Sequence, residues 1–581
     1  MVSGIWIRCA AAVTSLAAAT FVSGAPRDAP ASLARGIEAL HLFEYEEANA
    51  AFQEAHRLAP GLVMACWGEA MTYHQTLWRH EDVQQGRAAL ARCGATPAAR
   101  AAKAGSHKEQ MLLAAADVLF GAGDSAERRQ RYAAALAQVY AQEHGDADVA
   151  SFYALALLGT MSRGLIGSDP HEGHSRALAG SDTQKQVNEI LRNVLQAHPS
   201  HLGALHYLLH NNDDPEHAAA ALPAARALAR QAPDSSHALH MPAHIFLQVG
   251  AWLDAVASDT AAFAASDAWV KRKGLPLALR SYHALSWKAY ELLQLGRVRE
   301  ARAMLDEIEP VVNAAAKDQA QLTLLSDLSS MRARQVIETA NWPQMARQTT
   351  FGNADELFAI ALSAARTGNL QVAERARAAL ADRARDEREG DLRPAIAIME
   401  REVAATIAFG AGRREEGLTI LRAAAEEEAR LPAPLGLPEP IKPAPELLGE
   451  MLIDAGRPAD ADAFFDAALR RNPKRTLSLA GRARAAGAAG DSPHARAIYA
   501  ELLENVKSAD ADYALVAEAR AALARQDFST PPRWVGAFTS TGGLLIVGVL
   551  AAMLVAAVMM LRARVRAAPR TIVKTARRRR R

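Results

Sequence analysis

Apolar residues recur along this chain at helical spacing, in pairs of segments separated by a short turn. Within residues 46–58, Ala48, Phe52 and Ala55 fall on one helical face, and Pro60 ends the pattern. The same order of small, large and small apolar residues followed by proline returns near the other end of the chain, at Ala461, Phe465, Ala468 and Pro473. This pattern predicts helical hairpins, each of which buries one apolar face against the next hairpin.

The predicted hairpins repeat at a regular interval. Pro199 matches Pro233, and His210 matches His244, when the chain is shifted by one unit. The interval, about 34 residues with two helices per unit, resembles that of the tetratricopeptide repeat family, and the likeness covers most of residues 29–507. The resemblance implies an all-α fold, a right-handed α-solenoid of helical hairpins. In such a solenoid the first helices line a concave groove that binds a protein or peptide partner.

A proline-rich segment interrupts the repeats at residues 431–445. We therefore expect an N-terminal and central repeat array over residues 26–430. A C-terminal repeat block with a closing helix is expected over residues 431–526.

The two ends of the chain predict export and a membrane anchor. Residues 1–25 combine a positive charge, an Ala-rich apolar stretch and small residues for cleavage, as in a signal peptide, with an uncleaved anchor as the alternative. After a linker at 527–541, residues 542–561 form a predicted transmembrane helix, because they give the roughly 20 apolar positions that a bilayer requires. The tail at 562–581 holds ten Lys or Arg and no acid, which favours a cytoplasmic C-terminus. These features predict a single-pass protein of the cell (inner) membrane, with its repeats in the periplasm or another extracytoplasmic space.

Overall charge and the known catalytic motifs narrow the possible functions. Lys and Arg number 66 against 64 Asp and Glu, so the net charge of +2 gives no bias toward nucleic acid. The chain has no P-loop, no dinucleotide-binding glycine pattern and no nucleophile elbow. The candidate chemistry lies in the histidines instead, because seven of the 18 fall between positions 201 and 246.

These histidines recur at matching places of consecutive first helices. His206 and His210 are four residues apart and share the side of their helix opposite Leu205, Leu208 and Leu209. The next first helix repeats the arrangement, and acidic residues follow in the turn after His210. The residues that we expect to line the groove are His206, His210, Asp213, Asp214, His237, His240, His244 and His283.

Imidazole pairs at this spacing are suited to a divalent transition metal such as Zn, Cu, Fe or Ni. Four ligands, His206, His210, His240 and His244, would make a closed structural site. Three histidines, or a histidine pair with Asp213 or Asp214, would leave an open position for catalysis. The acids could also orient the imidazoles from outside the ligand set. Pro242 weakens the hypothesis, because a kink there would turn His240 away from His244.

The histidine cluster leaves three interpretations open: a metal site, a metal-free ligand groove and a structural polar network. We expect a membrane-anchored scaffold that binds a protein or peptide partner and carries the metal site as a second feature, with no nucleic acid bound. The alternatives are a metal-dependent hydrolase or oxygenase, and a metal storage or delivery protein. The sequence does not decide whether the chain is an enzyme.

Two cysteines remain after the predicted signal peptide. Cys66 and Cys93 fall early in the first helix and late in the second helix of one predicted hairpin. Antiparallel packing would bring those two ends together, and an exported compartment would permit a disulfide. Two buried free thiols are the alternative.

Overall fold

The described part of the chain is almost entirely helical. The structure is a computed structural model, and it describes residues 28–161, 180–314, 319–348, 352–386, 390 and 392–525. Within these residues the strands are β1 (His74–Gln75) and β2 (His80–Glu81), which pair antiparallel. The predicted all-α class is therefore confirmed for the described residues.

The predicted leader and membrane segment lie beyond the part of the chain that the structure describes. Residues 1–25 and 527–581, which include the linker, the expected transmembrane helix and the basic tail, lie outside the described residues. Among the residues that are described, none of the helices has the length and apolar character that a membrane crossing requires.

The first eight helices precede the histidine region. Acceptor side chains at the N-caps of four of them, Asp82, Ser106, Asp124 and Asp146, define where these helices begin. The helices are α1 (Asp28–His41), α2 (Tyr45–Leu58), α3 (Val63–Thr72), α4 (Val83–Cys93), α5 (Pro97–Ala101), α6 (His107–Leu119), α7 (Ser125–Gln142) and α8 (Ala147–Gly159).

The central helices contain the histidines. They are α9 (Asp182–Ala197), α10 (Leu202–Asn211), α11 (Ala218–Gln231), α12 (Ser236–Gln248), α13 (Trp252–Lys273), η3 (Leu277–Leu279), α14 (Tyr282–Gln294), α15 (Val298–Ala314) and α16 (Gln319–Thr339). Helices α10, α12 and α14 are the first helices of three consecutive hairpins, and α12 contacts both α10 and α13.

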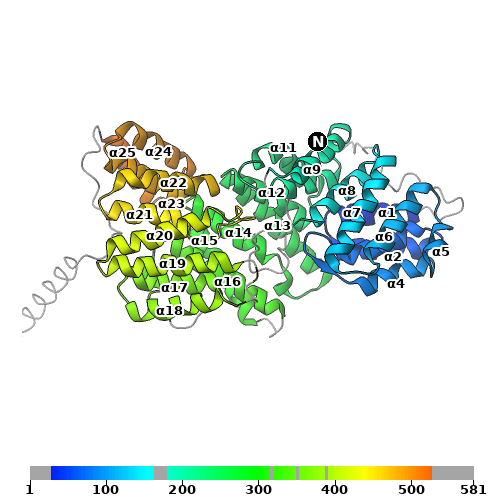
Figure 1. Cartoon of the computed structure of the whole chain (residues 1–581), viewed down its shortest axis with the longest axis horizontal. Coiled ribbons are helices and arrows are strands. Elements are labelled where there is room, and N and C mark those ends of the chain that lie inside the picture. Colours follow the sequence, from blue (N-terminus) through cyan, green and yellow to red (C-terminus); the bar gives the residue numbers. More distant parts are fainter. Residues whose placement is uncertain are drawn as a thin grey trace, which may run out of the picture. The chain divides into compact units, whose positions relative to one another are not determined.

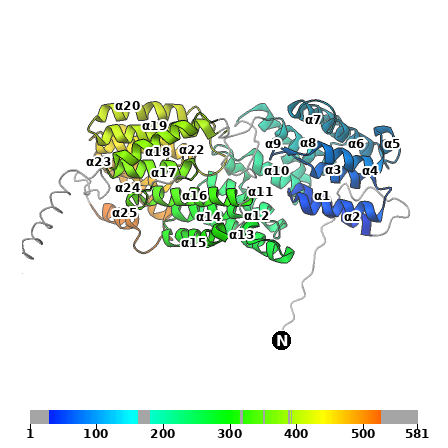
Figure 2. The same cartoon turned by 90° about the horizontal axis from the view of Figure 1, so that it is seen from below.

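The remaining helices continue the array. They are η4 (Trp342–Gln344), α17 (Ala354–Arg366), α18 (Leu370–Arg383), α19 (Arg393–Gly410), α20 (Arg414–Glu428), α21 (Ala444–Asp454), α22 (Pro458–Arg471), α23 (Thr476–Ala488), α24 (Ser492–Asn505) and α25 (Ala514–Ala524). Helices α17, α18, α19 and α20 lie side by side in two perpendicular views (Figure 1 and Figure 2). All the described residues belong to one compact unit.

The repeat unit owes its packing to an aromatic ring held between two glycines. Phe52 of α2 is fully buried, and a Cβ added at Gly36 or Gly68 would lie 2.6 or 2.3 Å from its ring. The same arrangement, with the glycines at the same sequence distance before and after the ring, returns where Phe465 packs on Gly449 of α21 and Gly481 of α23. Only glycine leaves room for the ring at these places, so the sequence periodicity reflects a repeated packing contact.

The proline-rich segment 431–443, which we call the strap, contains no helix and crosses several helices. Gln248 of α12 donates to the carbonyl oxygen of Pro434 at 3.1 Å. A Cβ added at Gly436 would lie 2.4 Å from the Trp287 ring of α14. The strap therefore packs on the first helices of two histidine-bearing hairpins.

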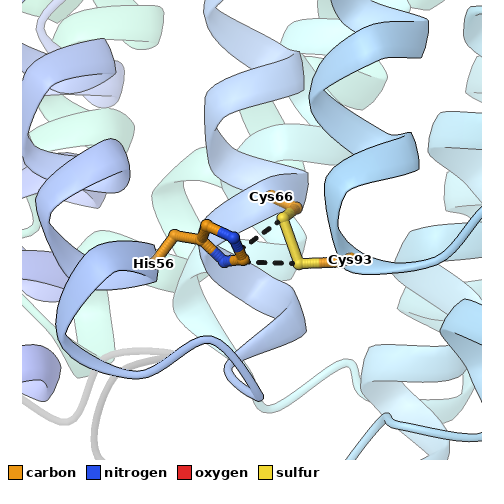
Figure 3. Close-up of side chains that lie close together, drawn as sticks. All are labelled: His56, Cys66 and Cys93. Carbon is orange, nitrogen blue, oxygen red and sulfur yellow. Dashed lines mark hydrogen bonds between the residues drawn. A yellow bond between two sulfur atoms is a disulfide. The ribbon is translucent and has the colours of Figure 1, made fainter.

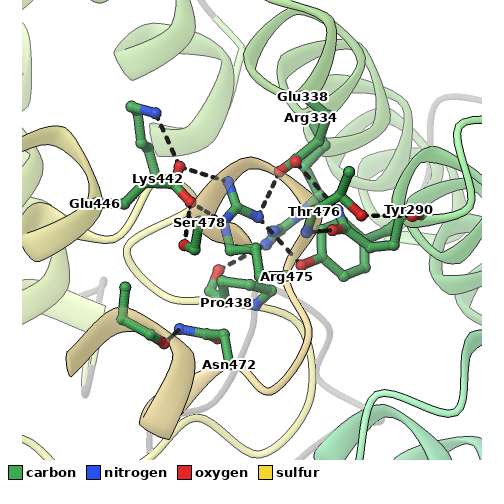
Figure 4. Close-up of polar contacts among 12 residues, drawn as sticks. Tyr290, Arg334, Glu338, Pro438, Lys442, Glu446, Asn472, Arg475, Thr476 and Ser478 are labelled. Carbon is green, nitrogen blue, oxygen red and sulfur yellow. Dashed lines mark hydrogen bonds and ion pairs between the residues drawn. The ribbon is translucent and has the colours of Figure 1, made fainter. Parts of the chain in front are cut away.

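A buried ionic cluster links the end of the strap to helices α16 and α21 (Figure 4). Arg475 is fully buried and donates to Glu446 of α21 at 2.8 Å and to Glu338 of α16 at 2.6 Å. Lys442, at the end of the strap, donates to Glu446 at 2.8 Å. Burial alone would raise the pKa of Glu446, but the charges of Arg475 and Lys442 lower it to about 2. The cluster is therefore ionised and balanced, and removal of one member would leave buried charge unpaired.

Candidate metal centres

Six histidines of α10, α12 and α14 form two groups of three. Helix α10 carries His206 and His210, and α12 carries His240 and His244 one repeat later. The third histidine of each group is the second residue of the following first helix. These residues are His237 of α12 and His283 of α14.

Side-chain caps give these helices the same starting register. Ser235 and Ser281 precede α12 and α14, and each hydroxyl accepts from the backbone amide three residues later. The first turns of α12 and α14 therefore present their histidines at equivalent positions. This repetition explains why the chain builds the same group twice.

The first triad consists of His206, His210 and His237. The Nε2 atom of His206 lies 3.0 Å from Nε2 of His210 and 3.0 Å from Nε2 of His237. On the other side of the His206 ring, Nδ1 donates to the backbone carbonyl oxygen of His41 at 2.7 Å.

The second triad consists of His240, His244 and His283. The Nε2 atoms of His240 and His283 lie 3.0 Å apart. The ring centroids of His240 and His244 are 4.9 Å apart, close to the 4.8 Å between the corresponding rings of the first triad. Pro242 lies inside α12 without interrupting it, so the two histidines still share one side of the helix.

The nitrogen–nitrogen distances in the first triad suit a bound cation better than hydrogen bonds between metal-free histidines. Because its Nδ1 donates to a carbonyl oxygen, neutral His206 has a single lone pair at Nε2. That lone pair can accept one N–H, yet two other Nε2 atoms lie 3.0 Å from it. Zinc with Zn–N bonds near 2.0–2.1 Å places tetrahedral nitrogen ligands about 3.3 Å apart. The two 3.0 Å separations at His206 Nε2 are therefore within a few tenths of an ångström of those in a zinc ligand set.

Burial keeps the imidazoles in the neutral form that binds metal. It lowers the pKa of His206 to about 4 and the pKa of His240 to about 3. The pKa of His244 is also lowered by burial. At neutral pH these rings therefore carry a lone pair for a ligand bond rather than a positive charge.

Carboxylates orient the rings of the second triad. His240 Nδ1 lies 2.5 Å from Asp259 Oδ1, and His244 Nδ1 lies 2.9 Å from Asp213 Oδ2. Burial raises the pKa of Asp259 and of its neighbour Glu291. A carboxylate behind a ligating imidazole fixes its tautomer and raises its basicity. Asp213 and Asp259 therefore act on the ring nitrogen that faces away from the second triad.

Asp214, which we considered as a possible metal ligand, has a structural role in the turn that follows α10. Its carboxylate accepts from the backbone amides of Glu216 and His217 and from the side chain of Gln184. It therefore stabilises the turn before α11.

The four histidines expected to form one closed site are divided between the two triads. His206 and His210 converge on His237, whereas His240 and His244 converge on His283. The physical reason is that the first turn of each first helix reaches the histidine pair of the preceding one. The equivalent position in α10 is Gly203, where an added Cβ would lie 2.3 Å from Nδ1 of His41.

The chain itself covers both triads, where we expected an open groove. His206, His210, His240 and His244 are at most 3% exposed. The Phe43 ring packs on the first triad, with its centroid 4.5 Å from that of His206. Trp287 packs on the second triad, 4.3 Å from the His244 ring, and the strap lies against Trp287. Segments of the chain itself thus fill the space next to these histidines that we expected a bound partner to fill.

A third histidine group lies behind the first triad. Asp148 Oδ1 lies 2.9 Å from His41 Nε2 and 3.1 Å from His201 Nε2. His41 links this group to the first triad through its backbone carbonyl. Sequence reasoning missed His41, Asp148 and Asp259. His41 and Asp148 come from helices distant in sequence from α10, and Asp259 comes from the helix that follows α12, so no short spacing identifies them.

Comparisons with known proteins do not assign the chain to a family. No family model matches it, and no curated protein matches it. Among solved structures it is similar to a chain of the APC/C hetero-tetramer Cut9–Hcn1, with 12% identity over 84% of this chain and 96% of that chain. The TM-score of 0.23 is too low to carry an argument. The helical-hairpin architecture therefore rests on the coordinates of this chain.

Proposed function

We propose that this protein binds transition metal ions in its two histidine triads, one ion in each. The observation that carries the proposal is that one ring nitrogen from each of three imidazoles lies within 4.8 Å of the other two in each triad. Oxygen acceptors hold the opposite ring nitrogens of His206, His240 and His244. Both features are typical of histidines that bind a metal ion, in which Nε2 binds the metal and a hydrogen bond holds Nδ1 in place.

The donor set favours Zn²⁺, Cu²⁺, Ni²⁺ or Fe²⁺, because it consists of neutral imidazole nitrogen alone. The two triads are one repeat apart, and adjacent helices pack about 8–10 Å from each other. Each triad would therefore hold a separate ion rather than share a bridged pair.

The direct test is a metal count on full-length protein with its disulfide intact. After chelation and dialysis, the protein is titrated with Zn²⁺ and bound metal is measured by mass spectrometry. We expect two equivalents per chain. Protein that stays free of metal at saturating Zn²⁺ would overturn the proposal.

Variants assign the two equivalents. His206→Ala with His210→Ala should leave one equivalent, and His240→Ala with His244→Ala should also leave one. His217→Ala is the matched control, because this neighbouring histidine contacts Asp214 and lies outside both triads. It should keep both ions. A loss of metal in the control equal to that in the triad variants would contradict the assignment.

Three protein ligands leave a coordination position open, which favours a metal-dependent enzyme, a hydrolase or an oxygenase, as the second candidate function. Azide added to the Cu²⁺- or Co²⁺-loaded protein tests this candidate. A change in the visible spectrum would show an exchangeable position. An unchanged spectrum would favour storage or delivery of the metal.

We also propose that the helical array is an exported, membrane-anchored scaffold for a protein or peptide partner. Exposed large apolar side chains favour a partner surface at η3, where Leu277 and Leu279 are 47% and 46% exposed. The Cys66–Cys93 disulfide suits an oxidising compartment.

A partner protein that co-purifies with the detergent-solubilised chain should be lost when Leu277 and Leu279 are changed to Asp. A reporter fused after Arg581 should be active only in the cytoplasm.

A further inference from the structure

His56, Cys66 and Cys93 meet where helices α2, α3 and α4 pack together (Figure 3). The two cysteines form a disulfide, with their Cα atoms 6.1 Å apart. His56 Nδ1 lies 3.6 Å from Sγ of Cys66 and 3.7 Å from Sγ of Cys93. A disulfide needs no imidazole, yet here one ring nitrogen faces both sulfur atoms.

The surrounding helices hold these three side chains firmly. Cys66 and Cys93 are fully buried, whereas His56 is partly exposed. Phe52, one turn before His56, is clamped against Gly68 of α3, two residues after Cys66. The imidazole and the sulfurs therefore stay close together even without the covalent bond.

We propose that reduction of the Cys66–Cys93 disulfide creates a Cys₂His site for a thiophilic divalent ion, with zinc as the expected ligand. A dithiol reductant supplies two electrons and two protons, and it leaves as its own disulfide while Cys66 and Cys93 become thiols. Metal binding then releases the two thiol protons, since thiolates are the ligands. This site uses none of the residues of the triads.

Charge and geometry both favour this ligand set. Two thiolates, a neutral imidazole and a divalent cation sum to zero charge, which lowers the cost of burying the site. The nearby Glu69 is already paired with Arg92 and adds no net charge. Zinc at about 2.3 Å from each sulfur places the sulfurs about 3.7 Å apart. Side-chain rotation achieves this separation while the helices stay in place.

Cobalt provides a readout that the triads cannot give. Full-length protein is reduced anaerobically, freed of reductant and titrated with Co²⁺, alongside the oxidised protein. We expect three equivalents in the reduced protein against two in the oxidised protein, with a thiolate-to-cobalt charge-transfer band only after reduction. Absence of that band and of the extra equivalent would overturn the proposal. Failure of the triads would instead remove two equivalents in both states and leave the band.

His56→Ala tests the imidazole ligand, because it leaves the disulfide and its packing intact. The affinity of the reduced protein for Co²⁺ at this site should fall by more than about tenfold. His107→Ala is the matched control, since His107 is an exposed histidine at the start of α6 and contacts Gln110. It should bind Co²⁺ as the unchanged protein does. Equal affinity in the His56→Ala variant would remove His56 from the site.

Discussion

The two triads have the same arrangement of histidines, but different groups accept from the ring nitrogens that face away from each triad. In each, two histidines four residues apart meet the second residue of the next first helix. A neutral backbone carbonyl, that of His41, accepts from the first triad, whereas the carboxylates of Asp213 and Asp259 accept from the second. The comparison shows that the repeat supplies the histidines and the surrounding chain supplies the electrostatics. We therefore expect the second triad to bind divalent ions more tightly.

The covers of the two triads also differ. Phe43, in the turn between α1 and α2, packs on the first triad. Trp287 packs on the second, backed by the strap. The ionic cluster around Arg475 holds the end of the strap, so the second triad depends on segments that are distant from it in sequence.

The largest expected effect is the stabilisation by bound metal. An ion at 100 times its Kd stabilises the folded state by about 2.7 kcal/mol per site. Saturating both triads should add about twice that to the free energy of unfolding, and His206→Ala with His210→Ala should remove about half of the gain. Denaturant unfolding with and without Zn²⁺ measures this. An equal shift in protein that lacks both histidine pairs would show that the metal acts elsewhere.

The next largest effect is expected from the carboxylate that supports the second triad and has no counterpart in the first. Asp259→Asn removes the carboxylate behind His240, and it should weaken metal binding at the second triad by about 10- to 100-fold. Binding at the first triad should not change. Asp254→Asn, an exposed site on the same helix paired with Arg226, is the control. Isothermal titration of each variant measures both sites, and equal weakening at the two triads would contradict the assignment.

A pair of glycine substitutions tests the two covers. Gly203→Ala would press a methyl group against His41 behind the first triad, and Gly436→Ala would press one against Trp287 over the second. Each should destabilise the protein by about 1–3 kcal/mol. Each should also weaken metal binding at its own triad only. Weakening at the opposite triad would show that the strap and His41 do not act locally.

The smallest effect is expected from the group behind the first triad. Asp148→Asn removes the charge that holds His41 and His201, and the backbone carbonyl of His41 accepts from His206 of the triad. The affinity of the first triad should fall by less than about tenfold, because the change acts through one intermediate residue. The second triad serves as the internal control in the same titration. A complete loss of the first ion would place Asp148 or His41 in the ligand set.

The amino-acid sequence alone determined the helical hairpins and the histidine pairs. The spacing of small and large apolar residues around Phe52 and Phe465 reflects a local packing contact that recurs in these two repeats, so it is visible in the pattern. The spacing of His206 from His210, and its return in the next repeat, places each pair on one helical side.

Only the tertiary structure decided which histidines belong together. The contact of His237 with the pair on α10 depends on how two helices pack, and a period does not specify that distance. Asp259 reaches the second triad from α13 and the strap reaches it from a non-helical segment, and no local pattern marks either of them. Burial, which keeps His206 and His240 neutral, is likewise a property of the packed chain. Phe43 covers the first triad, and Trp287 with the strap covers the second, only in the folded protein.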